Sequence, residues 1–264
     1  MPYLITRADD YGSSFGANNA IIQAVQGNFI RNVSCMAVGP RIEEGADFIR
    51  ESGCCLGLHA VLNSEWDRWK WHPCSSPEKI RSLLTATGDF PPTTTWFVQN
   101  PPDISEIIYE FDSQLDTLAK LKIPVSYVDM HMMPYAEIPE LRKEMSAWIA
   151  QKGLIDHIGL YRTPKQFEPI ASTELNQAEK NWKSWLELMS DGQYFALMHP
   201  CVLNEESLLI GNREHDGLYV AKCRDTEYQL IASGYLEQCC QECGIETISY
   251  VQAVEMGFNQ EDSI

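Results

Sequence analysis

The sequence lacks the features that mark membrane, secreted and nucleic-acid-binding proteins. No stretch approaches the roughly 20 apolar residues that cross a bilayer, and the first residues show no basic region followed by an apolar one. Basic residues are few: 20 Lys and Arg stand against 37 Asp and Glu, a formal net charge of −17, and they form no cluster. Nucleic acids and anionic membranes both attract clustered positive charge. We therefore expect a cytoplasmic protein that binds neither nucleic acid nor membranes, and whose substrate is a neutral sugar or a cation.

Internal repeats, linkers and low-complexity tracts are also missing. The 264 residues are 44% hydrophobic and 22% charged, which is typical of a soluble globular enzyme. Since one α/β barrel commonly has about 250 residues, we expect one domain over 1–264. In the cytoplasm the nine cysteines are expected to be reduced thiols. Cys239, Cys240 and Cys243 resemble half of a zinc site, but no second Cys/His pair at the right spacing completes it.

Short apolar runs alternate with segments of helical spacing along most of the chain. Strands are expected at the N-terminus as far as Asp9 and Asp10, and at 32–39, 54–58, 125–129, 154–161, 194–198 and 245–250. Helices are expected at 18–26, 40–52, 104–121, 139–152, 175–189 and 226–243, with 201–220 irregular. This alternation predicts a parallel α/β fold. We expect a distorted, TIM-like (β/α) barrel.

One irregular segment, at about 60–102, interrupts the alternation. It is rich in proline and contains Trp66, Trp69, Trp71 and Trp96. Long irregular segments within a compact domain are often functional, and aromatic rings suit the apolar faces of sugars. Trp66 and Trp69 are therefore candidate substrate contacts. The alternative is a surface excursion whose tryptophans pack against the barrel.

Polar groups follow four of the expected strands. Asp9 and Asp10 end the first, His59 the third, Asp129-x-His131 the fourth and His199 the sixth. The carboxyl ends of parallel strands meet at one face of a barrel, where active sites lie. One carboxylate and two imidazoles, from Asp10, His59 and His131, form a familiar set for a divalent metal such as Mg²⁺ or Zn²⁺. Asp9 could then act as the base on a metal-activated water, and His199 could protonate a leaving amine.

Other roles remain open for these residues. A histidine at a strand end often caps or donates a hydrogen bond, and Asp-Tyr-Gly often forms a turn. Asp129 could contact substrate, cap a turn or orient His131. Arg162 could hold Asp9 or a substrate group, or form an ion pair at the rim of the barrel.

The two adjacent acids raise a geometric problem. Neighbouring residues on a regular strand point to opposite faces, so Asp9 and Asp10 cannot both face one metal. The strand must end or twist at this pair, and Gly12 provides local freedom.

With these motifs in order, the sequence resembles the YdjC-like (ChbG/HpnK) carbohydrate deacetylase family. The matching stretches run in the family's order along nearly the whole chain: Ala8-Asp-Asp-Tyr-Gly12, Asn18-Asn-Ala-Ile-Ile22, Leu56-Gly-Leu-His59, Val128-Asp-Met-His131, Met198-His-Pro200 and Arg224-Asp-Thr-Glu227. The resemblance implies a distorted barrel that removes N-acetyl groups from amino sugars, often chitin-derived disaccharides. It also implies a divalent metal held by Asp10, His59 and His131, with Asp9 as base and His199 as acid.

The sequence departs from the family at one loop. Many members have further histidines after the Asp-x-His step, where this chain has Met132 and Met133. We expect a metal-dependent hydrolase that releases acetate from amino sugars or short chitin-type oligosaccharides, and we consider a homodimer as its assembly. The alternatives are another metal-dependent barrel enzyme, such as a sugar isomerase or amidohydrolase, and a non-catalytic carbohydrate-binding protein.

Overall fold

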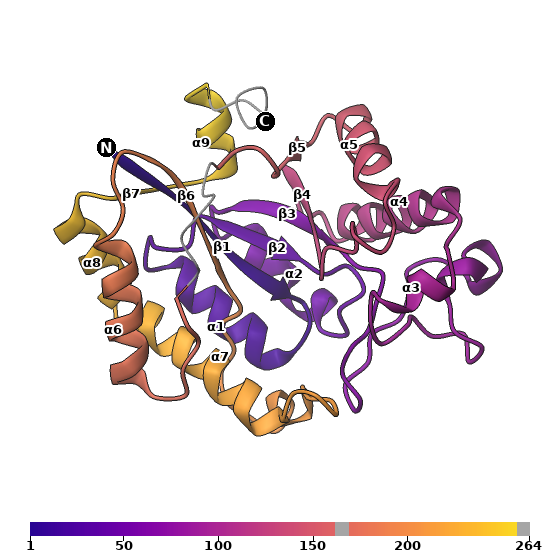
Figure 1. Cartoon of the computed structure of the whole chain (residues 1–264), viewed down its shortest axis with the longest axis horizontal. Coiled ribbons are helices and arrows are strands. Elements are labelled where there is room, and N and C mark those ends of the chain that lie inside the picture. Colours follow the sequence, from indigo (N-terminus) through magenta and orange to yellow (C-terminus); the bar gives the residue numbers. More distant parts are fainter. Residues whose placement is uncertain (162–168, 258–264) are drawn as a thin grey trace.

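A parallel sheet that curls into a partial barrel forms the centre of the molecule (Figure 1). The computed structural model describes residues 1–161 and 169–257. Its strands are β1 (Pro2–Tyr11), β2 (Asn32–Cys35), β3 (Cys55–Ala60), β4 (Tyr127–Met130), β5 (Ile155–Asp156), β6 (Gly192–Met198) and β7 (Glu246–Ile248). Their order is β5-β4-β3-β2-β1-β6, with β7 also paired to β1. Within the described ranges β5 and β6 form the two edges, so the predicted distorted barrel is confirmed in an open form.

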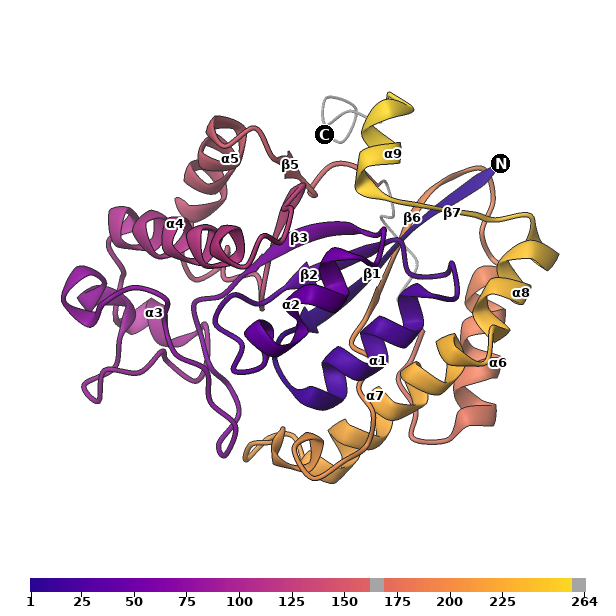
Figure 2. The ribbon, with the colours of Figure 1, turned by 180° about the vertical axis from the view of Figure 1, so that it is seen from behind.

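Helices surround this sheet (Figures 1 and 2). They are α1 (Phe15–Val25), α2 (Ile42–Arg50), α3 (Trp96–Gln99), α4 (Ile104–Lys120), α5 (Leu141–Gln151), α6 (Leu175–Leu186), α7 (Gly217–Ala232), α8 (Tyr235–Cys243) and α9 (Tyr250–Glu255), with 3₁₀ turns η1 (Pro77–Lys79), η2 (Arg81–Leu83) and η3 (Ser207–Leu209). Helices α1 and α2 cover the face seen in Figure 2, α4 and α5 lie at one side of the sheet, and α6 to α8 lie at the other. No helix in the described part of the chain is both long and apolar enough to cross a membrane.

The expected single helix over 226–243 is wrong. The structure has α7, which begins earlier at Gly217 after its N-cap Asp216, and a separate α8. Gly234 separates them with a left-handed backbone, φ 74°, a conformation that glycine adopts without steric cost and that ends a helix. Similarly, the fifth strand is limited to β5, and its expected continuation to 161 is not strand.

Strand β1 divides its side chains between two apolar clusters. Leu4 packs with the helices in the larger cluster, whereas Ile5 packs inside the barrel with Tyr127 and Tyr250. This alternation is the period of two of a regular strand. The same alternation turns the side chain of Arg7 inward. It also determines the direction in which Asp9 points.

Candidate metal centre and active site

A local irregularity in β1 brings both of its acids to one site. By alternation Asp9 faces inward and Asp10 would face outward. The pairing of β1 with β2 shifts register between Ala8 and Tyr11, and Asp10 has a left-handed backbone with φ 69°. Such a bulge re-aims a side chain. The predicted twist at the Asp9–Asp10 pair is thus confirmed, with Asp10 itself, as well as Gly12 (φ 97°), adopting the unusual backbone.

Asp10, His59 and His131 place three ligand atoms in a small triangle. Asp10 Oδ1 lies 3.6 Å from His59 Nε2 and 3.8 Å from His131 Nδ1, and the two nitrogens are 3.1 Å apart. A point equidistant from these atoms lies about 2.0 Å from each, close to the bond lengths that zinc makes to His nitrogen and carboxylate oxygen. All three side chains are buried, and Asp10 Oδ1 has no hydrogen-bond partner among the described residues. An unpaired buried carboxylate oxygen is costly, so these residues fit a metal ion.

A carboxylate lies against the outer ring nitrogen of each of the two histidines. Asp129 Oδ2 lies 2.6 Å from His59 Nδ1, and Glu65 Oε2 lies 3.0 Å from His131 Nε2. Each carboxylate accepts the ring N–H of its histidine, which leaves the other ring nitrogen free for a metal.

Arg224 holds the third ligand. Its Nη1 lies 2.9 Å from Asp10 Oδ2, which leaves Oδ1 as the open oxygen. Burial raises the pKa of Asp10, but Arg224, followed by His199, His131 and His59, outweighs burial and lowers this pKa well below its ordinary value.

Asp9 is held next to this triangle by Arg7. The guanidinium donates from Nε to Asp9 Oδ1 at 2.6 Å and from Nη2 to Oδ2 at 2.8 Å. Arg7 Nη2 also lies 3.2 Å from Asp129 Oδ2, and Nη1 donates to the Tyr250 hydroxyl at 3.2 Å. Asp9, His59 and Asp129 could by distance hold an ion of their own, but Arg7 already bridges the two carboxylates.

The charged side chains of the site do not balance. They comprise four carboxylates and two guanidinium groups: Asp9, Asp10, Glu65, Asp129, Arg7 and Arg224. With neutral imidazoles, two negative charges remain in a largely buried setting. A divalent cation neutralises them, which agrees with the geometry of the three ligand atoms.

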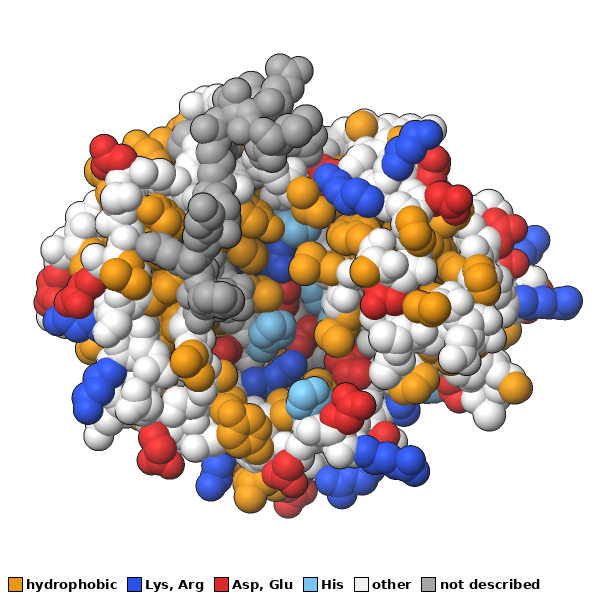
Figure 3. All heavy atoms as spheres, in the orientation of Figure 1, with side chains coloured by type: hydrophobic (Ala, Val, Ile, Leu, Met, Phe, Trp, Pro, Cys, Tyr) orange, Lys and Arg blue, Asp and Glu red, His pale blue; other side chains and the backbone are white. Residues whose placement is uncertain are grey.

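His199 completes the site from the end of β6. Its backbone N–H donates to Glu227 Oε2 at 2.7 Å, and its side chain is partly exposed. Burial lowers the pKa of His199, and although the Asp10 carboxylate opposes this effect, the pKa stays below its ordinary value. Figure 3 shows histidine, acidic and basic side chains at the floor of a hollow in this face of the molecule.

Comparisons with known proteins agree with this fold. The family model described as YdjC-like protein matches residues 3–242. The chain belongs to the YdjC-like family. A relative from Oceanobacillus iheyensis, named carbohydrate deacetylase, is 25% identical to this YdjC-like chain over 191 residues, which cover 70% of this chain and 73% of the relative. A carbohydrate deacetylase from Thermoanaerobacter pseudethanolicus is 27% identical over 131 residues, half of each chain.

Two solved structures share the fold of this YdjC-like protein. A protein from Enterococcus faecalis V583, named for cellobiose-phosphate cleavage, superposes with a TM-score of 0.75 at 17% identity, over 95% of this chain and 98% of the other. The catalytic domain of a peptidoglycan N-acetylglucosamine deacetylase from Eubacterium rectale has a TM-score of 0.54 at 9% identity, over 95% and 89% of the two chains. At these identities the likeness shows the fold alone.

The residues of this YdjC-like chain that were expected to contact substrate differ from one another in burial and in partners. Trp66 is buried, with the Arg224 guanidinium 5.8 Å from its ring centre. Trp69 is half-buried and donates from Nε1 to the Ser13 carbonyl at 2.8 Å. Asp129 is fully buried, and its Oδ2 lies 2.6 Å from His59 Nδ1. Arg162 lies outside the described residues.

Three site residues of this YdjC-like chain were not predicted. Arg7 lies two residues before the acids, and period-two alternation could have found it, because residues 5, 7 and 9 share a face. Arg224 stands in the motif Arg224-Asp-Thr-Glu227 but had no expected role. Glu65 lies in the irregular segment, where no periodicity indicates which way a side chain points.

Proposed function

We propose that the protein is a metal-dependent hydrolase that removes N-acetyl groups from amino sugars or short chitin-type oligosaccharides and releases acetate. Two lines of support combine: relatives of the same family are named carbohydrate deacetylases, and the site contains a metal-ligand triangle, a candidate base and a candidate acid. Other metal-dependent barrel enzymes and a carbohydrate-binding module are the alternatives.

Asp10, His59 and His131 would hold the metal. When bound, a divalent ion supplies Lewis acidity, which activates a water and polarises the acyl oxygen of the substrate. Two imidazoles and one carboxylate suit zinc and its neighbours in the first transition series, whereas magnesium prefers oxygen ligands alone. Among the expected ions, this donor set therefore favours Zn²⁺ over Mg²⁺.

Asp9 is the proposed proton acceptor. Each oxygen of a carboxylate has two acceptor positions, so Asp9 can accept from Arg7 on both oxygens and still take a proton from the attacking water. Because Arg7 engages both oxygens, the carboxylate is locked in one orientation. A fixed base next to a metal is what hydrolysis requires and what sugar binding alone does not.

His199 is the proposed proton donor to the departing amine nitrogen. The water oxygen forms a bond to the acyl carbon, the C–N bond breaks, and the proton from His199 completes the amine. A lowered pKa makes a protonated His199 a ready donor. Trp66 and Trp69, at the edge of the same site, are proposed contacts for the sugar.

One observation carries the proposal: Asp9, held through both carboxylate oxygens by Arg7, stands beside an open Asp10–His59–His131 triangle. A binding module needs neither base nor acid. A sugar isomerase would favour a lysine or further carboxylates at the strand ends in place of His199.

Acetate release tests the proposal. The protein, with Zn²⁺, Mg²⁺, Mn²⁺ or Co²⁺ added singly, is incubated with N-acetylglucosamine, its β-1,4-linked disaccharide and trisaccharide, and other N-acetylated sugars. We expect acetate from at least one sugar with at least one ion, and no acetate after chelation. Absence of acetate from every combination, in protein that binds the ions, would favour the alternatives.

A further inference from the structure

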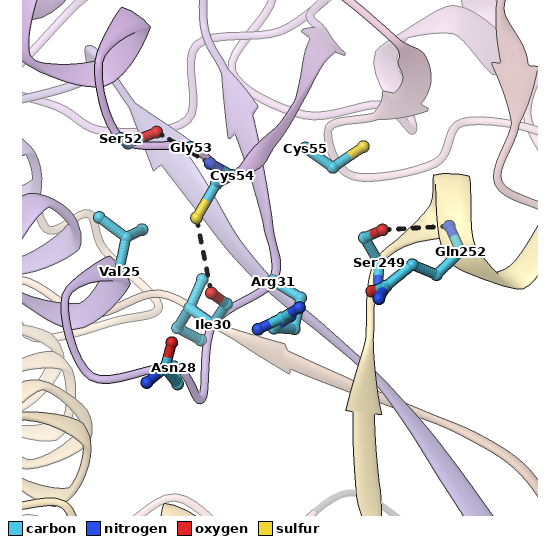
Figure 4. Close-up of a pocket in the computed structure, with 10 residues that line it drawn as sticks. All are labelled: Val25, Asn28, Ile30, Arg31, Ser52, Gly53, Cys54, Cys55, Ser249 and Gln252. Carbon is cyan, nitrogen blue, oxygen red and sulfur yellow. Dashed lines mark hydrogen bonds between the residues drawn. The ribbon is translucent and has the colours of Figure 1, made fainter.

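A second hollow lies at the opposite end of the sheet from the metal centre. It has a volume of about 270 Å³ and is formed where β2 and β3 begin and where β7 leads into α9 (Figure 4). Its wall includes Asn28, Arg31, Ser52 and Gln252. Because β3 runs from this hollow towards His59, an ion bound here would not touch the proposed substrate site.

Arg31 supplies the charge of this hollow, and no described residue of its lining carries a negative charge. Its guanidinium has no hydrogen bond or ion pair with any residue in the described ranges, although its backbone N–H donates to Thr6. The lining residues include no Asp or Glu. In a chain with a net charge of −17, a concave site whose described lining carries positive charge alone attracts anions.

A fixed amide faces Arg31 across the hollow. Ser249 and Gln252 form a capping box, in which the Gln252 Oε1 accepts from the Ser249 backbone N–H at 2.9 Å. This bond fixes the amide, so Nε2 is left as a donor of two hydrogens. Figure 4 shows Arg31 and the amide end of Gln252 on facing sides of the hollow. Two donors that face each other, one of them charged, are separated by a space suited to an acceptor.

We propose that this hollow binds a small phosphate-type oxyanion, either inorganic phosphate or the phosphate of a small phosphomonoester. The planar guanidinium of Arg31 matches a phosphate through paired N–H groups. Gln252 Nε2 donates from the opposite side, and the side chains of Asn28 and Ser52 supply further hydrogen-bonding groups on the wall.

The hollow is also connected to the active site through side chains. Asn32, next to Arg31, accepts from the Tyr250 backbone N–H at 2.8 Å. Tyr250, next to Ser249, accepts from Arg7 through its hydroxyl. The contacts of the residues next to Arg31 and Ser249 therefore lead to Arg7 in the candidate active site.

The test measures the rise in melting temperature with added phosphate, at constant ionic strength, for the 264-residue protein and four variants. Arg31→Met removes the charge. Gln252→Glu keeps the capping box, since glutamate serves it equally well, but places a carboxylate opposite Arg31. Arg81→Met removes an exposed arginine elsewhere, and Asp10→Asn alters the metal site, the other place where phosphate could bind.

We expect a rise of about 3 °C for the wild type at a phosphate concentration ten times its Kd. Arg81→Met and Asp10→Asn should show the same rise, and Arg31→Met and Gln252→Glu should lose it. Gln252→Glu should fold with at least wild-type stability, because its carboxylate can pair with Arg31, so loss of response in this variant does not reflect unfolding.

Two results would overturn the proposal. One is an equal rise in Arg31→Met and wild type, which would mean that phosphate acts as a general stabilising salt. The other is a rise that disappears in Asp10→Asn but persists in Gln252→Glu, which would place the phosphate at the metal site. Titration with phosphate and with glucose 6-phosphate then identifies the source of the anion by the lower Kd.

Discussion

The candidate site is built in two ways, by the ends of strands β1, β3 and β4 and by the irregular segment at about 60–102. The strands deliver Asp10, His59 and His131, whose positions follow from a regular backbone and a single bulge. The segment delivers Glu65, which side-chain amides hold in place: Asn212 Nδ2 donates to its backbone carbonyl at 3.2 Å, and Asn63 Nδ2 donates to its Oε2 at 3.0 Å. Backbone regularity thus places the ligand atoms, and a non-repeating segment helps to orient one of them.

Loss of a strand ligand should have the largest effect. His59→Gln should weaken metal binding by more than 100-fold, above the roughly 10–100-fold typical for groups that only orient a ligand. His157→Gln is the matched control, because His157 is also a buried histidine near Arg7 but lies outside the triangle. Calorimetric titration with Zn²⁺ measures both. Equal affinity in the two variants would remove His59 from the metal site.

Loss of a carboxylate that orients a histidine should have the next largest effect. Asp129 lies on strand β4 and Glu65 in the irregular segment, so the two variants compare strand and segment directly. Asp129→Asn and Glu65→Gln should each weaken metal binding by about 10–100-fold. Asp129→Asn should have the larger effect, because it also removes a charge partner of Arg7. If Glu65→Gln binds metal as the wild type does, the segment is a surface excursion that does not support the site.

The pH dependence of metal binding tests how strongly the neighbouring carboxylates raise the pKa of His59. In the metal-free protein burial lowers the pKa of His59, but Asp129, Asp9 and Asp10 outweigh burial and raise it to about 9. The metal must displace this proton, so affinity should rise about tenfold per pH unit from 7 to 9 and level off above.

The free energy of unfolding of the metal-free protein should fall as pH rises, whereas metal affinity should increase. A raised pKa in the folded state means that protonated His59 stabilises fully below its unfolded pKa of 6.5 and that this contribution is lost as pH rises through about 9. Denaturant unfolding at pH 6, 7.5 and 9 measures it. Asp129→Asn should flatten both curves, and unchanged curves in this variant would contradict the assigned cause.

The smallest effect should come from loss of the hydrogen bond between Trp69 of the irregular segment and Ser13. Trp69→Phe removes the hydrogen bond from Nε1 to the Ser13 carbonyl and should lower the free energy of unfolding by about 0.5–1.5 kcal/mol. Metal affinity should not change. Trp96→Phe, which also replaces an indole by a smaller ring elsewhere in the segment, is the control for the loss of buried apolar surface. A large loss of metal affinity in Trp69→Phe would show that the segment and the strands act as one unit.

The same contrast explains how much could be predicted. The sequence predicts that Asp10, His59 and His131 lie close together, because parallel strands end at one face, and the structure brings these three side chains together. The barrel followed from the alternation of strands and helices. Glu65 could not be found, because its direction depends on contacts between residues far apart in the chain. The break between α7 and α8 was missed at Gly234, where a single left-handed residue interrupts a helical pattern that continues on both sides.

Bound metal and acetate release, measured on the same samples of wild type and Asp9→Asn, test the role of Asp9 as the base most directly. We expect one metal ion in both proteins, acetate release by the wild type, and a loss of about 10²–10⁴-fold in turnover for Asp9→Asn. Arg7 can still donate to the side-chain amide oxygen of this variant, so the fold should persist. Full turnover in metal-loaded Asp9→Asn would show that Asp9 is not the base.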